Sequence, residues 1–149
     1  MGHIASRQAT LYAEREGWGR PLEIIILEDV AAFLKNFAEG RDQCFVAEVD
    51  GVIAGSAFVT DDGKGRARLR LVYVEPWARG HGLGQKLVGA CVDFARASGY
   101  RAIWLWTHKI LESARRIYAG AGFAVLEAFE HDEFGVTIES ENWELSFDR

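Results

Sequence analysis

A short glycine-rich stretch, VEPWARGHGLGQKLV at residues 74–88, constrains this chain more than any other feature. It places Gly80, Gly82 and Gly84 at alternating positions between an apolar run and an amphipathic stretch. Glycines at a strand-to-helix junction let several backbone N–H groups converge on an anion, and the helix N-terminus adds about half a unit of positive charge. The stretch therefore predicts a strand, a phosphate-binding loop and a helix in succession.

Two well-known phosphate loops do not match this stretch. A Walker A loop requires Gly-Lys-Ser/Thr at the position where this chain has Gln85, counted from Gly80. A dinucleotide-binding fingerprint requires a further glycine at its sixth position. Counted from Gly80 or from the next glycine, that position holds Gln85 or Leu87. The loop is therefore of another kind.

The apolar residues of the first half of the chain follow helical and then strand-like spacing. Residues 21–40 carry apolar side chains at three- and four-residue steps, which predicts an amphipathic helix. Two apolar runs, at residues 44–49 and 52–59, flank the dipeptide Asp50-Gly51, which supplies the positive φ angles of a two-residue hairpin turn. Antiparallel strands are therefore expected there. A third strand is expected at residues 67–74, where Leu69, Leu71 and Tyr73 alternate with Arg68, Arg70 and Val72.

The second half of the chain favours a parallel crossover. Residues 82–98 trace one apolar helical face that Gly99 ends, and the run RAIWLWT at residues 101–107 is typical of a buried strand. A further helix is expected at residues 111–121, with strands at 123–130 and 142–147. A strand, a helix and a strand in succession imply a right-handed parallel crossover. The expected fold class is α/β with a mixed sheet, in one domain of residues 1–149.

Charge and composition exclude several classes of protein. Hydrophobic residues make up 49% of the chain, which excludes disorder, and the net charge of −5 without a basic block disfavours nucleic acid as a partner. The longest aliphatic run, residues 24–27, is too short to cross a membrane, and residues 1–10 lack the apolar core of a signal peptide, so a cytoplasmic location is expected. Cys44 and Cys91 lack metal-ligand spacing and are expected to be reduced thiols, with no metal site.

The pattern R-x-x-G-x-G, formed by Arg79, Gly82 and Gly84, resembles the signature loop of the GNAT superfamily of acetyl-CoA-dependent N-acetyltransferases. The segment SARRIYAGAGF, residues 113–123, resembles the second signature of that superfamily. Residues 69–147 are also similar to the acetyltransferase domain fused to MarR-type regulators. The resemblance implies a GNAT-like fold, which is a central, mostly antiparallel, twisted sheet of about six to seven strands with a parallel β-α-β crossover and flanking helices.

The resemblance also implies where acetyl-CoA, the expected co-substrate, would bind. Backbone amides from His81 to Gly84 would hold the pyrophosphate of the coenzyme, with the Arg79 amide at the edge. The strand at residues 72–74 would run beside the pantetheine, whose amides pair with exposed backbone much as an added strand does. Alternatively, Gly82 and Gly84 serve only close helix packing or a turn. The implied cofactor-binding residues are Val72, Tyr73, Val74, Arg79, Gly80, His81, Gly82, Leu83, Gly84 and Tyr118.

Acetyl transfer requires an amine that attacks the thioester, a donor for the oxyanion and a stabilised thiolate. The resemblance implies a strand amide near Val74 as that donor. Tyr118 matches the tyrosine that often acts as general acid toward the thiolate; a hydrogen bond without proton transfer, or a plain core position, are the alternatives. Glu75 and His108 are the candidate bases, because Glu75 ends the central strand and a histidine of pKa about 6.5 suits proton acceptance. A solvated glutamate and a surface histidine are the alternatives.

Two positions depart from the superfamily pattern. Leu111 stands where an asparagine is frequent and cannot replace its hydrogen bond, which His108 could supply instead. Arg68 stands near the glutamate that histone-type members place early in the central strand, which weakens a histone-lysine substrate. Residues 130–133 form a titratable cluster that would shape an acceptor site or lie in solvent.

Three functions stay open at this point. The first is an N-acetyltransferase that moves the acetyl group of acetyl-CoA to a primary amine of a small molecule or protein, by direct attack in a ternary complex. The acidic net charge would suit a cationic acceptor. The second is a non-catalytic acyl-CoA-binding sensor. The third is an interaction domain that dimerises through Trp104, Trp106 or Trp143; a homodimer is otherwise expected only by analogy.

Overall fold

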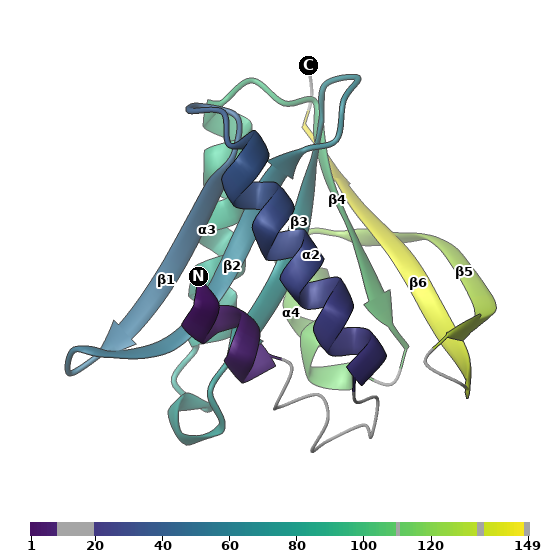
Figure 1. Ribbon diagram of the computed structural model, residues 1–149. Helices are drawn as coiled ribbons and strands as arrows, with labels where there is room; N and C mark the ends of the chain where they lie inside the picture. Colours follow the sequence, from purple (N-terminus) through teal and green to yellow (C-terminus); the bar gives the residue numbers. More distant parts are fainter. Residues whose placement is uncertain (9–19, 110, 134–135, 148–149) are drawn as a thin grey trace.

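A twisted sheet with helices on both faces forms the body of the molecule (Figure 1). The computed structural model describes residues 1–8, 20–109, 111–133 and 136–147. The sheet has six strands in the order β1-β2-β3-β4-β6-β5. Helices α3 (Leu83–Ala97) and α4 (Glu112–Gly120) cover one face, and α2 (Arg20–Asn36) crosses the other, beside a helical segment at residues 2–8.

The strands confirm the mixed sheet expected from the sequence. Strand β3 pairs with β4 in parallel, whereas every other neighbouring pair of these strands is antiparallel. Helix α3 connects the parallel pair, as the crossover requires. The helix at residues 2–8 was not expected. The strands are β1 (Gln43–Val49), β2 (Val52–Asp61), β3 (Arg66–Val74), β4 (Ala102–His108), β5 (Ala124–Glu133) and β6 (Val136–Ser146), and the short 3-10 helix η1 is Pro76–Ala78.

The hairpin turn between β1 and β2 has the predicted backbone. Asp50 has a φ of 52° and Gly51 a φ of 78°, which places both central residues in the left-handed region. Such a turn matches the right-handed twist of the two strands that it connects. It fixes the register in which Val49 pairs with Val52.

A bulge in β3 corrects the simple alternation expected for residues 67–74. Leu71 has a φ of 52°, and the register between β2 and β3 shifts between Ser56 and Phe58. An extra residue in one strand exchanges the faces on which the following side chains lie. Leu69 accordingly packs under α3, whereas Tyr73 packs in the cluster beneath α2 and residues 2–8.

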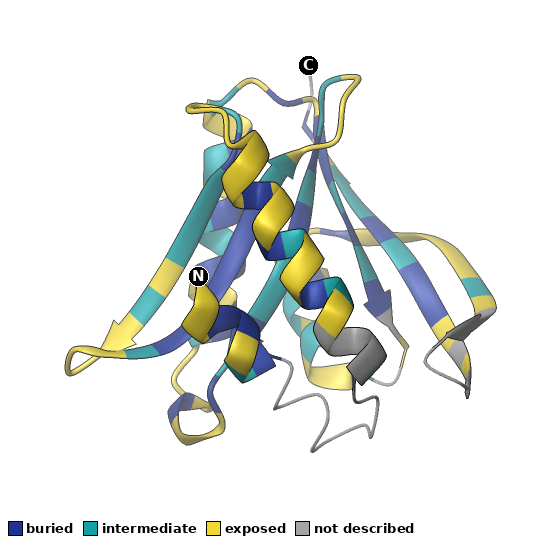
Figure 2. Ribbon diagram, viewed as in Figure 1, coloured by how far each residue is buried: buried dark blue, intermediate teal, exposed yellow. Residues whose placement is uncertain are grey.

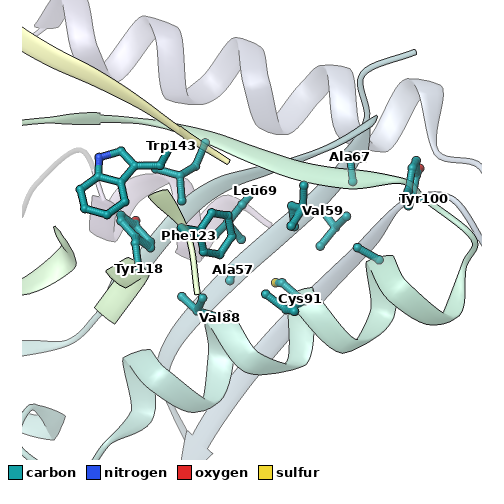
Figure 3. Close-up of a cluster of buried hydrophobic side chains, with 14 of the residues drawn as sticks. Ala57, Val59, Ala67, Leu69, Val88, Cys91, Tyr100, Tyr118, Phe123 and Trp143 are labelled. Atoms are coloured by element: carbon teal, nitrogen blue, oxygen red, sulfur yellow. The ribbon is translucent and has the colours of Figure 1, made fainter. Parts of the chain in front are cut away.

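The main core lies between the sheet and the helices α3 and α4 (Figure 3). Val88 and Cys91 of α3 face Val59 and Leu69 of the sheet, and Tyr118 of α4 joins the same cluster. Both cysteines are free thiols, and burial raises the pKa of Cys44 to about 11. The described helices include none that is long and apolar enough to cross a bilayer.

Candidate functional site

The glycine-rich loop leads into the N-terminus of α3. Gly80 has a φ of 85° and Gly82, the N-cap of α3, a φ of 72°. A side chain at Gly80 would meet no atom within 4 Å, so this glycine is favoured by its backbone angle and not by lack of space. The loop from Arg79 to Gly82 is exposed. It therefore offers backbone amides and the positive end of a helix to a ligand from solvent.

A glycine is required at position 84 for a different reason, which is lack of space. Gly84 is buried on the first turn of α3, and a Cβ atom there would lie 2.8 Å from the Cδ1 atom of Ile117 on α4. The missing side chain lets the two helices approach each other. Gly82 thus has the backbone angle of a turn, whereas Gly84 allows close packing of the two helices.

Strands β3 and β4 diverge directly beside this loop (Figure 1). Their parallel pairing runs only from Arg66 to Arg68 of β3, and the later residues of β3 pair with β2 alone. The amide of Glu75 donates to the carbonyl of Ala54 on β2 over 2.7 Å. Because successive amides of a strand point to opposite sides, we infer that the N–H of Val74 points toward β4, where none of the described strands pairs with this part of β3.

A glycine in β2 lets the end of β3 approach closely. A Cβ atom at Gly55 would lie 2.5 Å from the carbonyl oxygen of Tyr73 and 3.2 Å from the Cα of Val74. Only a glycine therefore lets the two backbones approach so closely here. A glycine inside an apolar run, as at residues 52–59, is the sequence signal for such an approach.

Tyr118 lies on the same side of the sheet as the loop and α3. Its side chain is buried, and its ring centroid lies 6.0 Å from that of Phe123 and 6.4 Å from that of Trp143 (Figure 3). The ring of Tyr118 is therefore part of the main core, as the alternative interpretation of this residue expected. The role of its hydroxyl toward a thiolate stays a prediction.

Glu75 is joined to the helical segment at residues 2–8. Its two carboxylate oxygens accept hydrogen bonds from Nε and Nη2 of Arg7, each over 2.8 Å. This pairing lowers the pKa of Glu75, which is 3% exposed. A carboxylate held in this way is a weaker proton acceptor, so the geometry favours a positioning role. Sequence reasoning missed Arg7 because the short helix that carries it has no clear apolar period.

The other candidate residues are less fully placed. His108 ends β4 opposite Ser140 of β6, and its side chain lies outside the described part. The side chains of residues 131–133 also lie outside it, whereas Glu130 is exposed on β5. Leu111 is the N-cap of α4 and makes no side-chain cap. Within the described residues, no three His, Cys, Asp or Glu side chains could together hold a metal ion.

A groove lies between the helices α3 and α4. It has a volume of about 360 Å³ and is open to solvent. Its lining begins at Gln85, next to the glycine loop, and the other lining residues are Gly89, Val92, Asp93, Arg96, Ile117, Gly120 and Ala121. The groove thus begins beside the glycine loop at the N-terminus of α3 and extends along the helix to Arg96.

Comparisons with known proteins agree with this geometry. The model of the acetyltransferase (GNAT) family matches residues 8–123. Human N-acetyltransferase 8B is 31% identical over 121 residues, which are 77% of this chain and 53% of that protein. The uncharacterized N-acetyltransferase in the hisH-hisA intergenic region of Azospirillum brasilense is 41% identical over 78 residues, which are 48% of this chain and 45% of that one. The chain thus spans about half the length of these curated relatives.

The fold is also that of solved structures. The structure of yncA from Salmonella typhimurium with its cofactor acetyl-CoA superimposes with a TM-score of 0.72 and 23% sequence identity. The match covers 82% of this chain and 74% of that one.

Proposed function

This chain belongs to the acetyltransferase (GNAT) family, and from that premise we propose that it transfers the acetyl group of acetyl-CoA to a primary amine of a small molecule or protein. The amine attacks the thioester directly, in a ternary complex. One observation carries the proposal: a loop of left-handed glycines at the N-terminus of α3 lies beside an unpaired edge of β3.

The chain's own residues fit the coenzyme in three places. The amides from His81 to Gly84 bind the pyrophosphate, assisted by the dipole of α3. The groove along α3 and α4 takes the neighbouring part of the coenzyme. The edge of β3 at residues 72–74 pairs with the amides of the pantetheine, as an added strand would. The thioester is thereby delivered to the point where the Val74 amide has no strand partner.

The reaction needs stabilisation of charge at two atoms. The N–H of Val74 donates to the carbonyl oxygen of the thioester, on which negative charge develops. Tyr118 is the candidate donor to the departing sulfur. Because a phenol has a pKa of about 10 and a thiol a pKa of about 8.5, proton transfer from Tyr118 to the thiolate is uphill by roughly 2 kcal/mol. Tyr118 therefore needs only to donate a hydrogen bond to the departing sulfur, without transfer of its proton.

The amine must lose a proton before or during attack. A lysine-like amine of pKa about 10.4 is only about 0.04% neutral at pH 7, so a proton acceptor assists. Glu75 is held by Arg7. His108 or a chain of water molecules is then the better candidate acceptor.

The ion pair of Glu75 also supports a second candidate function, a non-catalytic acyl-CoA sensor. In such a module the carboxylate would only hold the helix at residues 2–8 in place, and no base would be needed. Binding of acetyl-CoA without transfer to any amine distinguishes this function from the enzyme.

Calorimetric titration with acetyl-CoA tests the proposal. We expect micromolar binding to the wild type and its loss in Gly82→Glu, which places a carboxylate in the anion site. Gly40→Glu is the matched control, because Gly40 also has a left-handed φ, of 80°, and lies in open space outside the loop. Wild-type protein that is folded but binds no acetyl-CoA would overturn the proposal. Release of free thiol with a panel of amines then separates enzyme from sensor.

A further inference from the structure

We propose that the acceptor amine carries an anionic group, a carboxylate in its simplest form, and that Arg68 binds this group beside Trp104. The inference rests on the proposed function, since it names the class of acceptor that the same site would take. It comes from a set of arginines on the face of the sheet opposite α3.

The acceptor has to approach from the face that the coenzyme leaves open. The loop, the groove and α3 lie on one face of the sheet, together with the side chains of Ala67 and Leu69. Side chains of a strand alternate between faces, so Arg68 lies on the other face. Arg68 is opposite Trp104 in the last parallel pair before β3 and β4 diverge. Arg68 therefore lies at the closed end of the gap between β3 and β4, where the far end of a bound acceptor would lie.

Aromatic stacking holds the Arg68 guanidinium in place. Its central carbon lies 4.7 Å from the centroid of the Trp104 ring, and that of Arg66 lies 5.2 Å from the same ring. The Nε1 atom of Trp104 donates to Asp62 over 2.8 Å, which fixes the indole. A guanidinium is planar in itself, and a position over an aromatic ring holds it in place while its N–H groups can still pair with a carboxylate.

Arg68 differs from Arg66 and Arg70 because no ion pair among the described residues holds its guanidinium, although the carboxylates of Asp29 and Asp62 lie near enough to act on its charge. Arg70 pairs with Asp29 over 2.6 Å, and Arg66 with Glu144 over 3.8 Å. In the part of the chain that the structure describes, the guanidinium of Arg68 has no hydrogen bond or ion pair, and its Nε is buried. Burial, and then the charge of Arg70, lower the pKa of Arg68 from its ordinary value, while Asp29 and Asp62 act in the opposite direction. An anion of the acceptor would pair with this guanidinium.

The spacing along β3 limits the acceptor further. Strands rise about 3.3 Å per residue, so Arg68 lies about 20 Å along the strand from Val74, a separation that the long arginine side chain shortens. The amine and the anion of the acceptor are therefore separated by roughly two to four extended residues. Short peptides with a free carboxyl terminus and long ω-amino acids have this form. The net charge of −5 is a property of the whole chain, and it does not exclude an anionic acceptor beside the arginines of β3.

A matched pair of acceptors tests the inference. Tetraglycine and tetraglycine amide present the same amine and differ in the terminal carboxylate, and kcat/KM is measured by thiol release. We expect the wild type to prefer tetraglycine by about 10-fold to 100-fold, as for a charge-assisted hydrogen bond. Arg68→Gln should lose this preference, and Arg68→Lys should keep part of it. Arg101→Gln, at an exposed arginine that donates to the carbonyl of Lys64, should keep all of it.

A second measurement needs no turnover. The acetylated products of the two peptides are titrated into the protein with CoA, and we expect the carboxylate form to bind more tightly only while Arg68 is present. Equal affinities, binding of neither product, or a preference that survives Arg68→Gln would overturn the inference. Each of these results leaves the proposed function standing if acetyl-CoA binds and thiol is released with other amines. Failure of acetyl-CoA itself to bind is instead the failure of the proposed function.

Discussion

The two faces of the sheet are built in different ways. Beneath α3 and α4, apolar side chains form one contiguous core (Figure 3). Beneath α2 and residues 2–8, two smaller apolar clusters are accompanied by ion pairs, of Arg7 with Glu75 and of Arg70 with Asp29. The outer surface of α2 stays exposed (Figure 2).

This difference separates two kinds of recognition. On the α3 face, the features suited to a coenzyme are backbone features: left-handed glycines, a helix N-terminus and an unpaired strand edge. On the opposite face, the features suited to an acceptor are charged and aromatic side chains such as Arg68 and Trp104. A backbone site can persist while side chains change, so one fold can keep its coenzyme and vary its acceptor.

The largest expected effect compares the two sets of apolar contacts. Leu105 faces the large core and Ile26 a small cluster, and they are 1% and 2% exposed. Leu105→Ala should lower the free energy of unfolding by an amount in the upper part of the range of about 2 to 5 kcal/mol, and Ile26→Ala by one in the lower part. Urea unfolding measures both. Equal losses would show that the two faces contribute alike.

A smaller effect compares two tyrosines that are both 7% exposed, Tyr118 on the α3 face and Tyr73 on the other. Tyr118→Phe should lower kcat by about 10²-fold and keep acetyl-CoA binding, because the contact with the sulfur is lost. The hydroxyl of Tyr73 is buried with no hydrogen-bond partner among the described residues. The substitution Tyr73→Phe leaves the backbone edge of β3 unchanged, so it should keep kcat and raise the free energy of unfolding by up to about 1 kcal/mol. A similar loss of kcat in both variants would contradict a specific role for Tyr118.

The smallest effect concerns the ion pair that joins residues 2–8 to β3. Glu75→Gln should lower the free energy of unfolding at pH 7 by about 1 to 2 kcal/mol, less than for a fully buried pair because the side chain of Arg7 is 36% exposed. Hydrogen bonds from Arg7 lower the pKa of Glu75, so the pair stabilises the fold fully above the ordinary value of 4.5. The contribution is lost as the pH falls through the lowered pKa of the folded state.

Urea unfolding of wild type and Glu75→Gln at a series of pH values checks this sign. The difference between the two should shrink below pH 4.5, while Glu39→Gln, at an exposed glutamate, should behave as the wild type throughout. A difference that grows toward low pH would be inconsistent with the ion pair. A loss of kcat in Glu75→Gln without loss of stability would instead support Glu75 as the base.

Glycines and apolar periods carried most of what the sequence could predict. The Asp50-Gly51 turn, the loop at Gly80 and Gly82 and the helix behind it depend on local backbone preferences, which single residues reveal. The mixed sheet followed from the order of strands and helices. These predictions needed no knowledge of distant contacts.

The remaining features depend on contacts between distant residues. The bulge at Leu71 places a non-glycine residue at a positive φ, which no local preference predicts, and it moves Tyr73 to the unexpected face. The pair of Arg7 with Glu75 joins residues far apart in the chain through a helix too short to show a period. The stacking of Arg68 on Trp104 follows from the register of two parallel strands.

The diverging strands make this sheet incomplete in its interior. Beyond Arg68 and Trp104, β3 and β4 each keep an unpaired edge although neither lies at the rim of the sheet. Unpaired rims expose a protein to aggregation, whereas these two edges face each other within one sheet. A coenzyme bound there would act as a missing length of strand, and its concentration would raise the temperature of unfolding. The folding of the chain would thereby be linked to the supply of its coenzyme.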